Sequence, residues 1–130
     1  MVHAFHLDAK FISPHEEDFF NKYFNITCKS VTLNESYTDA VAIIINTTMY
    51  SIINNKNLKT CLEKETKHVI SQASKILKHY GFVKHKNRLI SKKLICERTH
   101  TISYYVLKAV VFSNLETFMR MLDKNNMCIN

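Results

Sequence analysis

Glycine and proline are scarce in this sequence, since Gly81 and Pro14 are their only representatives in 130 residues. This scarcity argues against a β-sandwich or barrel, which needs many glycine and proline corners, and against flexible linkers, which are rich in the same residues. A glycine-rich loop for nucleotide phosphates needs several glycines and is excluded too. Because 46% of the residues are hydrophobic, the chain can bury a core, and we expect one compact domain over residues 1–130.

Long apolar segments are also missing. The longest uninterrupted apolar run, residues 40–45, is six residues long, whereas a membrane-spanning helix needs about twenty. The N-terminal segment contains His3, His6 and Asp8, so it lacks the apolar stretch of a signal peptide. These absences predict a cytoplasmic or nuclear protein without a membrane partner.

Without an export signal, we expect the cysteines to be reduced and mostly buried rather than paired in disulfides. The four are Cys28, Cys61, Cys96 and Cys128. The nearest pairs of metal-binding residue types are His3 with His6, Cys61 with His68, and Cys96 with His100. None of these pairs has a second pair at the spacing of a zinc site. We therefore expect no metal and no other cofactor.

Motifs of the common enzyme classes are absent as well. The chain has no nucleophile elbow, no P-loop and no HExxH motif. An acidic cluster at Glu16, Glu17 and Asp18 has a sufficient explanation at the positive end of a predicted helix. The sequence therefore predicts a protein that is not an enzyme.

The clearest predicted element is a long amphipathic helix over residues 58–80. Its apolar residues recur at helical spacing, with lysines on the opposite face. A capping box formed by Thr60 and Glu63 is expected at its start, and Gly81 is placed to end it in a left-handed conformation. Two shorter helices are predicted by further capping boxes, over residues 14–25 and 114–123.

Segments rich in β-branched and aromatic residues are assigned to strands. They are residues 3–11, 26–33, two strands within 41–53, 89–96 and 101–112, the last two forming a hairpin. For residues 41–53, one β-branched helix capped by Asp39 is the alternative. The predicted fold is α+β, with a long central helix and two shorter helices packed on a small, mostly antiparallel sheet; an all-α bundle is the alternative.

The run KHVISQASKILKHYGF, residues 67–82, resembles the long helix of histone-fold transcription subunits and one helix of poxviral Bcl-2-like immunomodulators. Each resemblance covers less than a fifth of the chain. Both families are all-helical, so they imply the all-α alternative, whereas the composition of residues 89–112 favours the α+β fold.

Positive charge is concentrated in one part of the chain. Residues 59–93 hold 10 basic and 2 acidic residues, against 18 and 11 in the whole sequence. Seven of them are predicted to bind nucleic acid or an acidic partner: Lys75, Lys78, Lys84, Lys86, Arg88, Lys92 and Lys93. Since only one is arginine, contact with phosphate charge is favoured over bidentate recognition of bases. The alternative is an ordinary solvated helix face.

These features predict a small, non-enzymatic intracellular binding or adaptor module that acts through protein–protein contact or self-association. Its candidate surface is an exposed apolar patch or the edge of the predicted 101–112 strand. The alternative is a nucleic-acid-binding protein that uses residues 75–93. The bias towards lysine, isoleucine and asparagine is typical of an AT-rich genome and is compatible with a viral or host-interaction accessory protein.

Overall fold

The computed structural model describes Asp18, Lys22 and residues 33–85, 88–91 and 101–124. Its elements are α2 (Leu33–Ile53), α3 (Leu58–His79), β1 (Phe82–His85), β2 (Arg88–Ser91), α4 (Thr101–Ser113) and α5 (Leu115–Lys124). The predicted strand over 3–11 and nearly all of the predicted segments 14–25 and 26–33 lie outside the described residues. Asp18 and Lys22 are helical, and Leu33 begins α2.

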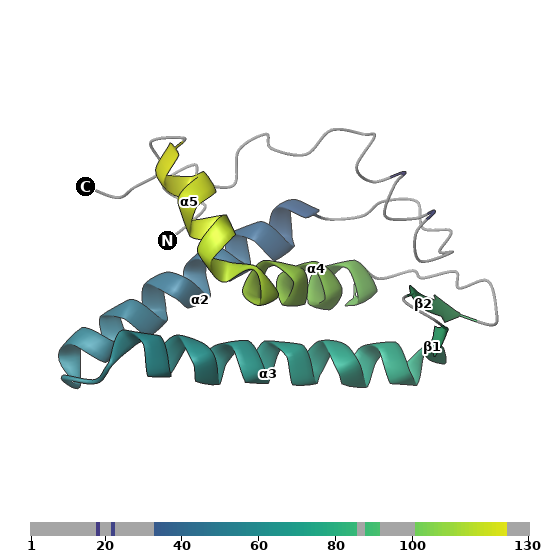
Figure 1. Cartoon of the computed structure of the whole chain (residues 1–130), viewed down its shortest axis with the longest axis horizontal. Coiled ribbons are helices and arrows are strands. Elements are labelled where there is room, and N and C mark those ends of the chain that lie inside the picture. The colour runs from purple at the N-terminus through teal and green to yellow at the C-terminus, as the bar shows by residue number, and fades with distance from the viewer. Residues whose placement is uncertain (1–17, 19–21, 23–32, 86–87, 92–100, 125–130) are drawn as a thin grey trace.

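The helices form two layers (Figure 1). The long helix α3 lies along the lower side, α4 runs back above it in the opposite direction, and α2 crosses obliquely towards the start of α3. The hairpin of β1 and β2 follows the far end of α3, and α5 turns upward from the end of α4. Among the described helices, none is both long enough and apolar enough to cross a membrane.

The prediction of a helix over 58–80 is confirmed, because α3 spans Leu58–His79 and buries Val69 and Ala73. Gly81 follows it with a φ of 74°, the left-handed conformation expected of a helix-ending glycine. The predicted start is wrong in detail. The N-cap is Asn57, whose side-chain oxygen accepts a hydrogen bond from the Thr60 backbone N–H at 3.1 Å.

The two strands predicted within residues 41–53 are wrong, because α2 is one continuous helix from Leu33 to Ile53. Asp39, considered as a cap for a helix here, lies inside it. Apolar residues occupy several sides of α2 since both α3 and α4 pack on it, so its sequence lacks a clear polar face. Tertiary packing overrides the low helix propensity of its isoleucines.

The strand predicted over 101–112 is also wrong, because these residues form α4. Instead, β2 pairs antiparallel with β1, with Val83 opposite Ile90 in the register. Residues 92–100, which include the rest of the predicted 89–96 strand, lie outside the described part. In that part the only strands are these two of four residues each. The fold is therefore nearly all-α, and the predicted α+β fold with an antiparallel sheet is corrected.

The helix predicted over 114–123 is confirmed as α5, but it does not require a strand before it. The backbone N–H of Asn114 donates to the Val110 carbonyl at 3.2 Å, and the Asn114 carbonyl accepts from the Phe118 N–H at 3.0 Å. Hydrogen bonding thus continues from α4 into α5, and the chain only bends at Asn114 (Figure 1).

Two apolar clusters lie along α3. One joins Phe82 of β1 to Ile102 and Val106 of α4 at the hairpin end. The other joins Val69 of α3 to Phe112 of α4, together with Ala40 and Ile44 of α2. Because α3 and α4 contribute to both, these two helices form the continuous part of the described core.

Candidate interaction surfaces

A groove lies between the first half of α3 and the bend that joins α4 to α5. Its volume is about 610 Å³. Its floor includes Leu62 of α3 and the fully buried Phe112 of α4, and Leu115 and Met119 of α5 form the opposite wall. The complete lining is Leu58, Lys59, Leu62, Glu63, Thr66, Lys67, Phe112, Ser113, Leu115, Glu116 and Met119. Apolar side chains therefore converge in a concave surface on a protein built of helices.

The groove has charges of both signs among its lining residues. Lys59, Glu63 and Lys67 follow one another at four-residue intervals on α3, and Glu116 lies on α5. Glu63 and Lys67 form no ion pair with each other or with any other described residue. Their charges are consequently available to a molecule that covers the groove.

The end of α2 forms an exposed apolar tip. Ile52 and Ile53 at the end of α2 are 73% and 76% exposed, and Met49 and Tyr50 are each about half exposed. Leu58, at the start of α3, is itself 36% exposed and also lines the groove. Large apolar side chains exposed together, rather than singly, are typical of surfaces that contact other molecules.

The outward side of α3 is basic, and Lys67 lies at the edge that this side shares with the groove. Lys64, Lys67, His68, Lys75, Lys78 and His79 are all exposed there, whereas Val69 and Ala73 face inward. Of the seven basic residues singled out in the sequence, Lys75 and Lys78 lie on this outer face and Lys84 is exposed on β1. Arg88 begins β2, and Lys86, Lys92 and Lys93 lie outside the described residues. The structure thus brings Lys75 and Lys78 together and adds Lys64 and Lys67.

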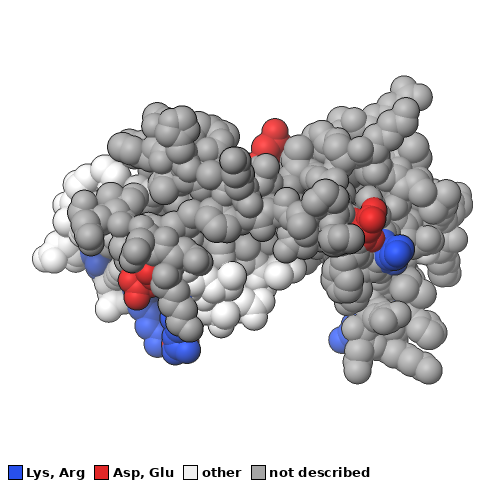
Figure 2. All heavy atoms as spheres, turned by 90° about the horizontal axis from the view of Figure 1, so that it is seen from above, with Lys and Arg blue, Asp and Glu red and all other residues white. Residues whose placement is uncertain are grey.

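Seen from above in Figure 2, the described lysines and arginines form a few separate groups, and residues outside the described part cover most of this view. On α5, Arg120 is paired with Glu116. The basic face is therefore identified from the exposed residues of α3 itself.

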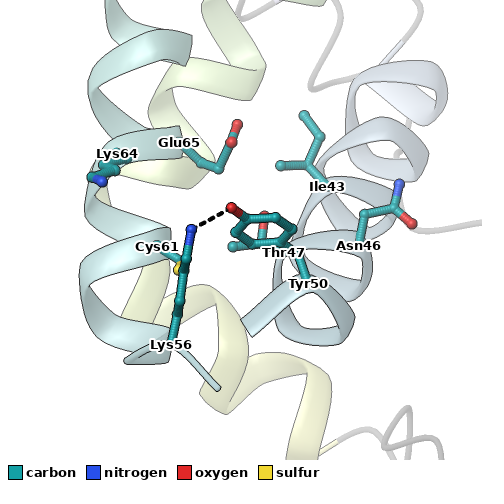
Figure 3. Close-up of a pocket in the computed structure, with 8 residues that line it drawn as sticks. All are labelled: Ile43, Asn46, Thr47, Tyr50, Lys56, Cys61, Lys64 and Glu65. Carbon is teal, nitrogen blue, oxygen red and sulfur yellow. Dashed lines mark hydrogen bonds between the residues drawn. The ribbon is translucent and has the colours of Figure 1, made fainter. Parts of the chain in front are cut away.

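A second, more polar pocket of about 520 Å³ lies where α2 meets the start of α3 (Figure 3). The Lys56 ammonium group donates a hydrogen bond to the Tyr50 hydroxyl at 2.6 Å, and this contact raises the pKa of Lys56. Cys61 also lines the pocket as a free, buried thiol, as the sequence predicted for this cysteine. Within this pocket, Tyr50 and Lys56 are therefore partners of one another.

A polar network connects α2 to α4. The Lys108 ammonium group donates to an Asp39 carboxylate oxygen at 2.7 Å and lies 4.4 Å from the centre of the Tyr104 ring. Burial raises the pKa of Tyr104, and a hydrogen bond to Asp39 raises it further. The Ser36 hydroxyl donates to the Tyr104 carbonyl at 3.2 Å. Since every group in this network has a partner within the fold, we interpret it as structural.

No three His, Cys, Asp or Glu side chains in the described part of the chain come together as a metal site would require. Comparison with protein-family models, with curated proteins and with solved structures found no match. Function is therefore inferred from the surfaces of the molecule itself.

The groove could not be found from the sequence, because its walls come from residues about fifty positions apart. The candidate docking edge placed at residues 101–112 does not exist, since these residues form α4. The sequence signal for the groove is the apolar content of α5. Among the described residues of this helix, Leu115 and Phe118 pack on the core cluster around Phe112. The exposed Met119 and Met121 are not part of that cluster.

Proposed function

We propose that this protein acts through protein–protein contact, by self-association through the groove between α3 and the α4–α5 bend. The observation that carries the proposal is an apolar concave surface lined by Leu62, Phe112 and Met119 and bordered by charges of both signs. Burial of such apolar surface is the main favourable term in protein association. Catalysis has no part in this proposal.

A second copy of the chain is the occupant that best fits the charges. In a two-fold arrangement, Glu63 of each copy lies opposite Lys67 of the other, so two ion pairs form across the interface. The outer face of α3 would repel a second copy, because its charges are all positive. Ile52 and Ile53 expose further apolar surface at the end of α2.

Sedimentation equilibrium of the purified protein tests this proposal. We expect the apparent mass to rise with concentration from 15.2 kDa towards twice that value. Met119→Glu should raise the dissociation constant by at least about tenfold, because it places a carboxylate in the apolar groove. Met121→Glu is the matched control, since Met121 lies on the same helix, is 57% exposed and does not line the groove.

Charge reversal tests the choice of occupant. Glu63→Lys and Lys67→Glu should each weaken self-association, whereas an equal mixture of the two variants should associate as a heterodimer, because opposite charges then face each other at both pairs. A protein that stays monomeric up to about 300 μM would overturn the proposal, since the dissociation constant would then exceed that value. Equal effects of the Met119 and Met121 variants would also contradict it.

A further inference from the structure

We propose that the outer face of α3 binds nucleic acid through the phosphate backbone. This face consists of Lys64, Lys67, Lys75 and Lys78, with His68 and His79 between them, and Lys84 on β1 extends it beyond the end of the helix. It lies on the other side of α3 from the core residues Val69 and Ala73. Lys67 lies at the edge that this face shares with the groove; the other four lysines do not line the groove, so the proposal does not depend on self-association.

The shape of the face suits a nucleic-acid strand. Lys64 and His79 are fifteen residues apart on one uninterrupted helix, a distance of about 22 Å. A strand of duplex DNA carries one phosphate per about 3.4 Å along its axis, so the face can follow about six phosphates of one strand. A straight basic helix of this length therefore offers several simultaneous contacts.

Among the described residues, none of the lysines of this face forms an ion pair. Glu63 borders the face near Lys64 and Lys67, whereas Ser71 and Ser74 are the exposed polar residues closer to Lys75 and Lys78. Neutralising phosphates with such lysines releases condensed counterions, which is the main driving force of sequence-independent binding. Lysine is a point charge without the planar fork that arginine uses on bases. We therefore expect affinity without base recognition.

An anionic membrane is the less favoured ligand of the same charge. A helix that lies on a membrane combines basic residues with an exposed apolar face that inserts between lipids. Between its lysines, the outer face of α3 offers serine and histidine side chains instead. Ile70, 41% exposed, is a single apolar residue beside the face and not the continuous apolar stripe of such a helix, and the exposed Ile52 and Ile53 lie on α2.

The test is fluorescence anisotropy with labelled single- and double-stranded DNA and RNA over a salt series, using the full chain. If all five lysines contact phosphates of duplex DNA, the affinity should fall about 500-fold between 50 and 200 mM salt, since each contact adds about 0.9 to the logarithmic slope. Duplexes of unrelated sequence should bind equally. The four probes decide whether DNA or RNA is preferred.

Two variants with the same change in net charge isolate the face. In the first variant, Gln replaces Lys75, Lys78 and Lys84. In the control variant, Gln replaces Lys22, Lys56 and Arg120. These three control residues are exposed, and none lies on the outer face of α3. The first variant should bind weakly, with the salt effect reduced to about 12-fold, and the control should keep most of its affinity. Neither variant changes Glu63, Lys67 or Met119, but Arg120 is the partner of the groove residue Glu116, so dimer formation of both variants is also measured by sedimentation.

Three results would overturn the proposal. They are absence of nucleic-acid binding at low salt, equal loss of affinity in both variants, and binding to phosphatidylserine vesicles without binding to any of the four nucleic-acid probes. Equal loss would mean that net charge matters and not its placement on α3. Vesicle binding alone would assign the face to a membrane surface.

Discussion

At the scale of single residues, the Asp39–Lys108 pair decides how α2 and α4 fit together. Lys108 is only 8% exposed, and its ammonium group lies 2.7 Å from the carboxylate of Asp39. A buried charge needs a partner, because desolvation alone costs several kcal/mol. Removing one member of the pair should therefore lower the free energy of unfolding more than replacing both members with apolar residues.

We predict that Lys108→Met destabilises the fold by about 3 kcal/mol, because it leaves Asp39 with an uncompensated charge. The double substitution Asp39→Leu with Lys108→Met should cost less than Lys108→Met alone, since apolar residues of similar size then fill the site. Urea unfolding followed by circular dichroism measures these two variants and Asp39→Leu alone. If the double variant were as unstable as the sum of the two single variants, the pair would have no coupling of this kind.

At the scale of elements, the start of α3 depends on Asn57 and not on the capping box expected from the sequence. Asn57 accepts the Thr60 N–H through its side chain and therefore satisfies one of the free donors of the first turn. The helix begins at Leu58, one turn before Thr60 could act as a cap.

Asn57→Ala should accordingly lower the free energy of unfolding by about 1 kcal/mol, whereas Asn57→Ser should preserve most of it, because serine can also cap. Thr60→Val is expected to change stability by less than about 0.5 kcal/mol. Thermal unfolding of the three variants distinguishes the two caps. A larger loss from Thr60→Val than from Asn57→Ala would restore Thr60 to the capping role.

The sequence predicted α3 and α5 because each buries one stripe and leaves the other side polar. It failed for α2 and α4 because both are packed on more than one side, so their apolar residues follow no helical period. Runs such as Ile43 to Ile45 and the valines of α4 have high strand propensity, and only contacts distant in sequence favour the helix.

The candidate surfaces divide in the same way. The basic face could be predicted in outline, because Lys75 and Lys78 belong to a helix whose period is visible in the sequence. The groove could not be predicted from the sequence, because Leu62 and Met119 come together only through the packing of α4 on α3 and the bend at Asn114. Local patterns locate a face, whereas a concave site requires the fold.

At the scale of the whole molecule, α3 and α4 link two apolar clusters that lie apart along their length. Ile102 belongs to the cluster at the hairpin end, and Ile44 belongs to the cluster where α2 crosses. Since both clusters share the same two helices, we expect them to unfold together.

Three Ile→Val substitutions test this. Ile44→Val and Ile102→Val should each cost about 1 kcal/mol, because each removes a buried methyl group. Ile52→Val removes an exposed one and should cost less than about 0.5 kcal/mol. The variant carrying both buried substitutions should lose about 2 kcal/mol in one transition, as measured by circular dichroism and tyrosine fluorescence. Separate transitions for the two probes would mean that the clusters unfold independently.

The two-sided character of α3 also has an evolutionary consequence. Lys75 and Lys78 take no part in the described core, whereas Val69 and Ala73, on the same helix, are buried in it. Substitutions to lysine can therefore accumulate on the outer face without disturbing packing. Such drift would raise affinity for polyanions step by step, so a charged surface of this kind can arise before selection acts on any particular ligand.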